Sequence, residues 1–160
     1  MKHLQGILIP TKRQEVNSLV QKLWIPESRK TTLCIDSYEN GILQGRFYGQ
    51  DREIQSFRSL SQFLILMEGI LDRTNEPQSD TTPRSFRSIL QQAAGDFSCG
   101  RIPKGTLATF ELQILFRQHT SWQGRILWQD QHMEQSFRSV LELILLMDSA
   151  LRGLEGREAV

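Results

Sequence analysis

Short peptides that recur at a fixed spacing restrict the fold of this 160-residue chain more than any other feature. Gln44-Gly45-Arg46 returns as Gln123-Gly124-Arg125, at a spacing of 79 residues. Gln55-Ser56-Phe57-Arg58-Ser59 returns as Gln135-Ser136-Phe137-Arg138-Ser139, at a spacing of 80. Ordered matches of this kind predict two tandem copies of one structural module.

Each copy has the pattern of two strands, a short third strand and a helix. Alternating apolar and polar residues in 108–128 indicate antiparallel strands with one buried face, and Asn40-Gly41 is a hairpin signal in the first copy. Ser59 and Ser139 open capping boxes, so a helix is expected after each. We therefore predict an α+β fold with two strand–strand–short strand–helix modules, a pseudo-twofold relation between them, and helices covering one face.

The regions outside the modules complete the expected organisation, which is that of one compact domain. Apolar residues at helical spacing predict an amphipathic helix near the N-terminus. The expected segments are an N-terminal strand and amphipathic helix (1–30), the first module (31–73), a linker with a short helix at 84–94 (74–107), the second module (108–153) and a tail (154–160).

Composition restricts the class of protein. Nineteen basic residues against eighteen acidic ones give no strong field to attract nucleic acid or an anionic membrane. The longest apolar runs, such as residues 143–147, are far shorter than the roughly 20 residues of a membrane-spanning helix. Two cysteines make no disulfide framework, and no signal peptide is evident. We expect a cytoplasmic protein with no membrane contact.

No catalytic or metal-binding motif is recognisable. His119 and His132 stand at opposite ends of a predicted strand, which argues against a shared metal ion. Cys34 falls in a predicted strand and is expected to be buried, and Cys99 has no evident base nearby. We expect no catalysis, no metal and no cofactor.

The second hairpin is the first candidate for a binding surface. Its turn contains Arg117, His119 and Trp122, and Trp and Arg are enriched at binding hot spots. It also reads as longer than the plain Asn40-Gly41 turn. The alternative is that Trp122 is buried in the core. Arg125 joins the candidates because basic and aromatic residues on a sheet are typical of nucleic-acid binding.

Two further candidates are Arg58 and Arg138, which stand beside predicted helix N-termini. A helix N-terminus with a neighbouring arginine can hold a phosphate or a carboxylate. The alternative is a solvated arginine that pairs with Glu142 or a turn carboxylate.

The two predicted module helices are apolar on nearly all sides. Between residues 140 and 147 only Glu142 is polar. Such helices need cover on more than one side, which the sister helix or a second chain could provide. Self-association or an unknown protein partner is therefore expected.

One more pattern concerns the second copy as a whole. Phe116-Arg117 precedes Trp122-Gln123-Gly124, and Phe137-Arg138-Ser139 precedes the helix. In these features residues 108–151 resemble a recurrent small module of bacterial proteins with no established activity. The resemblance implies a bacterial cytoplasmic origin, agrees with the module boundaries, and transfers no catalytic residue.

The leading functional prediction is a non-catalytic protein-interaction or regulatory module. The alternative is a small-molecule or anion-binding protein that uses the cleft between the two copies. Nucleic-acid binding through the sheet comes third, because of the neutral overall charge.

Overall fold

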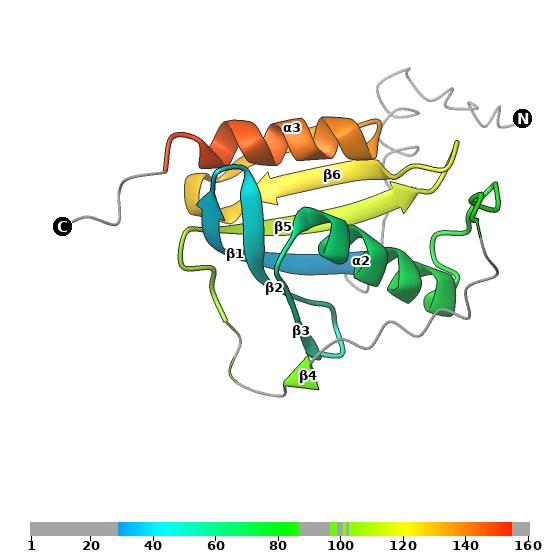
Figure 1. The fold of residues 1–160 in the computed structure, drawn as a ribbon, viewed down its shortest axis with the longest axis horizontal. Coiled ribbons are helices and arrows are strands. Elements are labelled where there is room, and N and C mark those ends of the chain that lie inside the picture. Colours follow the sequence, from blue (N-terminus) through cyan, green and yellow to red (C-terminus); the bar gives the residue numbers. More distant parts are fainter. Residues whose placement is uncertain (1–28, 87–96, 99–100, 102, 155–160) are drawn as a thin grey trace, which may run out of the picture.

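The computed structural model describes residues 29–86, 97–98, 101 and 103–154 of the chain. These residues form an antiparallel sheet of seven strands in the order β4-β3-β2-β1-β5-β6-β7, and two helices lie on one face of it (Figure 1). The predicted α+β class is thus confirmed. The elements are β1 (Lys30–Glu39), β2 (Ile42–Tyr48), β3 (Ile54–Phe57), α2 (Leu60–Thr74), β4 (Phe97–Ser98), β5 (Ala108–Phe116), β6 (Gln123–Trp128), the 3-10 turn η2 (Gln129–Gln131), β7 (Met133–Phe137) and α3 (Val140–Leu151).

The order strand, strand, short strand, helix occurs twice along the chain. We call residues 30–74 module 1 and residues 108–151 module 2. Their first strands, β1 and β5, pair with each other in the middle of the sheet. Each of these two strands also has a bulge at the same place, between Ile35 and Ser37 in β1 and between Ile114 and Phe116 in β5.

Two of the expected segments lie largely outside the described residues. The predicted N-terminal strand and helix fall in residues 1–28, which the structure does not describe. Of the short helix expected at 84–94, only residues 84–86 are described, and they are not helical.

A glycine and a phenylalanine face each other in each module. Gly45 pairs with Phe57, and Gly124 pairs with Phe137. Both phenylalanines are buried in the core under the two helices. A Cβ atom at Gly45 would lie 2.0 Å from a backbone carbonyl oxygen of the neighbouring strand, and the same holds at Gly124. Only glycine allows this close approach of the backbones.

Both predicted capping boxes are confirmed, with one difference. Ser59 Oγ accepts a hydrogen bond from the Gln62 amide, and Ser139 Oγ accepts one from the Glu142 amide, each at 3.2 Å. In a capping box the side chain three residues into the helix accepts a hydrogen bond from the amide of the capping serine. Here Gln62 and Glu142 accept instead from the backbone amides of Arg58 and Arg138, the residues before the two serines. The caps fix the points at which both helices begin.

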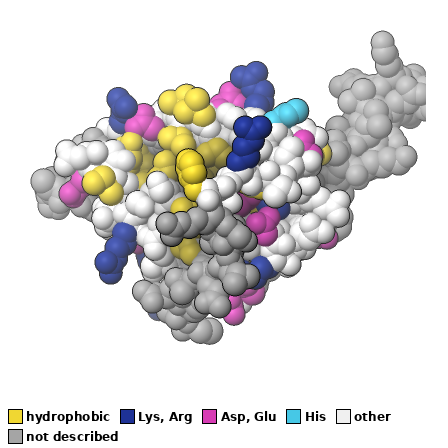
Figure 2. Space-filling view, turned by 45° about the vertical axis from the view of Figure 1, so that its right-hand side comes forward, with side chains coloured by type: hydrophobic (Ala, Val, Ile, Leu, Met, Phe, Trp, Pro, Cys, Tyr) yellow, Lys and Arg dark blue, Asp and Glu magenta, His cyan; other side chains and the backbone are white. Residues whose placement is uncertain are grey.

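Part of each helix surface stays apolar and exposed. Ile65 of α2 and Leu141 and Leu145 of α3 are more than half exposed. Hydrophobic side chains are visible among charged ones in the space-filling view (Figure 2). The described residues do not cover these three positions, so cover by a second chain stays a prediction.

The segment between the strands is longer in the second hairpin (117–122) than in the first (Asn40-Gly41), as expected, but two left-handed residues form the tip of each. Asn40 and Gly41 have φ values of 52° and 75°, and His119 and Thr120 have values of 55° and 56°. The Ser121 amide donates to the Gln118 carbonyl at 3.1 Å and closes the second turn. Two successive left-handed residues match the twist of a hairpin, but a β-branched residue is rare in that region.

We expect Thr120→Gly to raise the free energy of unfolding by about 0.5–1 kcal/mol. Left-handed backbone costs a non-glycine residue about 1–2 kcal/mol, and glycine loses about 0.5–1 kcal/mol of this gain through its greater freedom when unfolded. Urea unfolding measures the difference. Gly41→Thr, at the corresponding position, should be destabilising. A less stable Thr120→Gly would show that the hydroxyl contact of Thr120 with Thr81, at 2.9 Å, outweighs the strain.

Candidate ligand pocket

The side chain of Arg117 is buried rather than displayed on the second hairpin. Arg117 directly follows β5, and its side chain is only 3% exposed. One Nη atom donates to Glu68 Oε1 at 2.5 Å and also to Asp72, both on α2, and the other donates to the Pro77 carbonyl at 3.3 Å. Burial lowers the pKa of Arg117, but the bonds to Asp72 and Glu68 outweigh burial and raise it. Arg117 therefore stays charged and holds α2.

Trp122 is buried beside this ion cluster, as the alternative interpretation of the hairpin foresaw. Its Nε1 donates to the second carboxylate oxygen of Glu68 at 2.6 Å. Its ring meets Phe63 of α2 edge to face, with centroids 6.3 Å apart. Arg117 and Trp122 thus join module 2 to the helix of module 1, and both side chains are buried.

Module 1 makes the reciprocal contact. Tyr38, which stands 79 residues before Arg117, donates its hydroxyl to Asp148 of α3. Asp148 stands 80 residues after Glu68. Hydrogen bonds from Arg152 and then Tyr38 lower the pKa of Asp148. The first strand of each module therefore ends against an acidic residue on the helix of the other module.

Of the remaining predicted site residues, Arg58, His119 and Arg138 are exposed and do not converge. His119 donates its backbone amide to Asp80 at 3.1 Å. Arg138 binds Glu142 at 2.9 and 3.3 Å, which is the solvated pairing that the sequence left open as an alternative. Arg58 is exposed at the start of α2. These positions make no common pocket with one another.

Arg125 lies on the face of the sheet away from the helices, which we call the open face. Its guanidinium pairs with Glu134 at 3.4 Å. Two further basic residues on the described part of this face are paired in the same way, so it carries no free basic track of the kind that holds a nucleic-acid backbone. These pairs are Lys30 with Glu111 at 3.1 Å and Arg46 with Asp36 at 2.8 Å.

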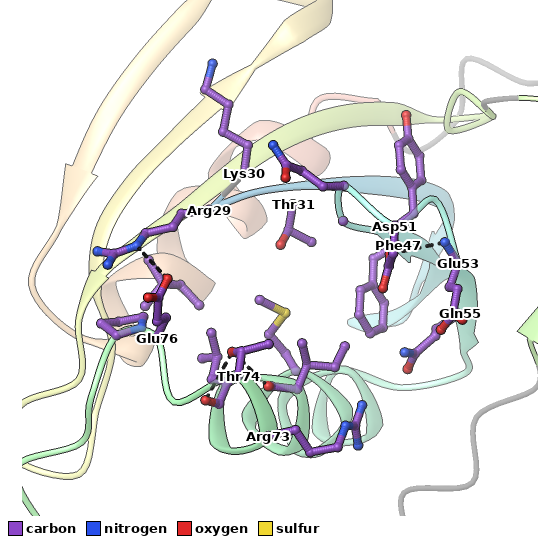
Figure 3. A pocket seen from close by; sticks show the side chains of 18 residues that line it. Arg29, Lys30, Thr31, Phe47, Asp51, Glu53, Gln55, Arg73, Thr74 and Glu76 are labelled. Atoms are coloured by element: carbon purple, nitrogen blue, oxygen red, sulfur yellow. Dashed lines mark hydrogen bonds and ion pairs between the residues drawn. The ribbon is translucent and has the colours of Figure 1, made fainter. Parts of the chain in front are cut away.

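Sequence reasoning missed a pocket of about 560 Å³ inside module 1 (Figure 3). It lies between α2 and the strands β1, β2 and β3 of module 1, with Ile114 of β5 as its one lining residue from module 2. Its apolar walls come from both layers and consist of Phe47, Met67, Ile70, Leu71 and Ile114. Its charged residues are three basic ones, Arg29, Lys30 and Arg73, and three acidic ones, Asp51, Glu53 and Glu76.

The pocket is open because two large side chains of module 2 have small counterparts in module 1. Phe110 and Trp128 pair across β5 and β6, with ring centroids 6.0 Å apart. The residues 79 positions earlier are Thr31 and Gly49, and both line the pocket. In module 2 the corresponding space, lined by Phe110 and Trp128 among others, is a groove of about 190 Å³. A comparison of the two modules at the 79-residue spacing could have found this difference in the sequence.

Two buried polar side chains, Gln55 and Thr31, face into the pocket (Figure 3). Gln55 is 5% exposed and Thr31 is 7% exposed. Neither side chain makes a hydrogen bond to the part of the chain that the structure describes. Because both side chains line the pocket, their polar atoms are available to a molecule bound there.

A third polar group at the pocket is Arg29. Its Nε lies 3.6 Å from Glu76 Oε2, which is close enough for an ion pair. The same Nε is buried and has no hydrogen-bond partner among the described residues. The charge of Arg29 is thus balanced by Glu76, while its Nε–H group has no hydrogen-bond acceptor in the described part of the chain.

The described residues show no sign of metal or thiol chemistry. They contain no group of three or more His, Cys, Asp or Glu side chains placed to hold a metal ion. Burial raises the pKa of the Cys34 thiol to about 11, and its sulfur lies 3.4 Å from the Pro103 carbonyl oxygen. A thiol in this state is a poor nucleophile.

Neither a membrane helix nor a relative points to the function. Within the described ranges, no helix has the length and apolar character needed to cross a membrane. Comparison with protein-family models, with curated proteins and with solved structures finds no match. The pocket of module 1 is therefore the feature from which a function can be inferred.

Proposed function

We propose that the protein binds a small organic molecule reversibly in the pocket of module 1 and does not transform it. The observation that carries this proposal is the contrast at one place in the two modules, with Phe110 and Trp128 in module 2 and Thr31 and Gly49 in module 1. The volume of about 560 Å³ is in the range of small-molecule sites. Mixed apolar walls and a few polar groups are also typical of such sites.

The proposal includes an origin by duplication in a bacterial cytoplasmic protein. Matching bulges, matching turns and the 79- and 80-residue spacings support two copies of one ancestral module, related by a pseudo-twofold axis between β1 and β5. After duplication, module 2 keeps a filled core and module 1 has an opened one. The position of α2 supports a regulatory role, because it forms a wall of the pocket and also holds Arg117 of module 2.

Filling the pocket tests the proposal. Thr31→Phe with Gly49→Trp places the module 2 residues in module 1, and we expect molecules that bind the wild-type protein to lose at least about tenfold in affinity. A fragment library screened by ligand-observed NMR supplies the binders. Thermal melting shows whether the variant is folded, and Gly49→Trp alone serves if the double variant is not.

Gly49→Ala is the matched control. A Cβ at Gly49 meets no atom closer than Asp51 Oδ1 at 3.8 Å, so the pocket stays open and binding should be retained. The proposal fails if the library yields no binder of the wild-type protein. It also fails if the binders have the same affinity for the Thr31→Phe, Gly49→Trp variant as for the wild type.

A further inference from the structure

We infer that the pocket selects a ligand with an uncharged carboxamide or lactam head group on an apolar body, and that Gln55 and Thr31 bind the head group. This inference rests on the proposed function and adds the chemical class of the ligand. It is drawn from the polar groups inside the pocket and from the charges around it.

The groups available to a head group are both neutral. The Gln55 side chain offers one N–H₂ donor group and one carbonyl acceptor, and the Thr31 hydroxyl can donate or accept. A carboxamide or lactam also has one donor and one acceptor side by side. It can therefore form two hydrogen bonds with the Gln55 amide, and Thr31 can complete the set.

A charged head group would be poorly compensated in this position. The carboxylates of Asp51 and Glu53 and the guanidinium of Arg73 belong to exposed residues, where water screens them. Arg29 and Glu76 balance each other and lie on the opposite side of the pocket from Gln55 (Figure 3). Burying a charge without a partner costs far more than burying a neutral group that is hydrogen-bonded.

The walls determine the rest of the ligand. Phe47 contributes an aromatic face, and Met67, Ile70 and Leu71 contribute flexible aliphatic surface from α2. Burial of an apolar body against these residues supplies most of the binding free energy, and the head group supplies orientation. A phenyl or alkyl body joined to an amide satisfies both requirements.

Three probes of the same shape and different charge test the inference. They are 3-phenylpropanamide, 3-phenylpropanoate and 3-phenylpropylamine, which are neutral, anionic and cationic at pH 7. Titration calorimetry on the full chain should show the amide binding at least about tenfold more tightly than either charged probe. A wild-type protein that prefers a charged probe, or that binds none of the three, overturns the inference.

Substitutions at Gln55 assign the preference to this residue. Gln55→Leu should abolish the advantage of the amide, and Gln55→Glu should move the preference to the amine, because the ammonium group favours and pairs with the charged carboxylate. Gln135 is the matched control, since it stands 80 residues later and is exposed, so Gln135→Glu should change nothing. Unchanged selectivity in Gln55→Glu would overturn the role of Gln55.

The two proposals fail in different ways. If a charged probe binds best and is lost in the pocket-filled variant, the inference about the head group fails and the proposed function stands. If bound molecules persist in the pocket-filled variant, the location of the site is wrong and both fail.

Discussion

Replacing Gly45 with alanine is expected to disrupt the sheet of module 1. The new Cβ would lie 2.0 Å from the carbonyl oxygen of Cys34 and 3.1 Å from its carbonyl carbon, and backbone atoms cannot move aside without breaking the pairing of β1 with β2. We expect a loss of more than about 4 kcal/mol, a large part of the roughly 5–15 kcal/mol that stabilises a domain. Soluble yield and urea unfolding measure the effect.

The corresponding glycine of module 2 should behave in the same way. A Cβ at Gly124 would lie 2.0 Å from the Gln113 carbonyl oxygen. Gly49→Ala provides the contrast, because its Cβ has room and its stability should match that of the wild type. A Gly45→Ala protein with the wild-type melting temperature would show that β1 and β2 do not approach this closely.

The second large effect is expected at Arg117. Arg117→Met keeps the volume of the side chain and removes the charge that holds Glu68 and Asp72, so we expect a loss of about 2–4 kcal/mol. Breaking a fully buried ion pair costs about 3–5 kcal/mol. The lower figure applies because the side chains of Glu68 and Asp72 are 28% and 45% exposed and water can solvate them in part.

Two further variants distinguish the loss of the Arg117 contact with α2 from the loss of a positive charge in general. Arg138→Met removes an arginine whose side chain is 89% exposed, and its stability should stay close to that of the wild type. Glu68→Gln combined with Arg117→Met should cost less than the sum of the two single changes, because both remove the same contact. Equal effects of Arg117→Met and Arg138→Met would mean that Arg117 does not join the modules.

Local patterns in the sequence were sufficient to predict the strands and helices of the two modules, but not the two-residue strand β4. The alternation in β5 and the serines at 59 and 139 act over a few residues, so strands and helix starts could be read directly. The sequence did not show that the side chains of Arg117 and Trp122 point into the protein, because their shared partner, Glu68, is 49 and 54 residues away. An arginine and a tryptophan in a turn look the same in sequence whether they face a partner or a helix of the same chain.

The pocket was missed for a different physical reason. The pocket exists because module 1 has no large side chains at positions 31 and 49. Thr31 and Gly49 leave the space that Phe110 and Trp128 fill in module 2. A threonine in a strand and a glycine near a turn are ordinary on their own. Their small size becomes informative only when the two modules are aligned at the 79-residue spacing, and the structure then shows that the space they leave is open.

Methyl NMR on methionine-labelled protein tests the central claim most directly, because methionines mark both modules. Met67 lines the pocket of module 1, the corresponding Met147 is buried in the core of module 2, and Met133 borders the smaller groove. On titration with 3-phenylpropanamide, the account predicts a shift of the Met67 methyl signal while those of Met147 and Met133 stay in place. A shift of Met133 without Met67, or no shift of Met67 at saturating probe, would contradict an open ligand pocket confined to module 1.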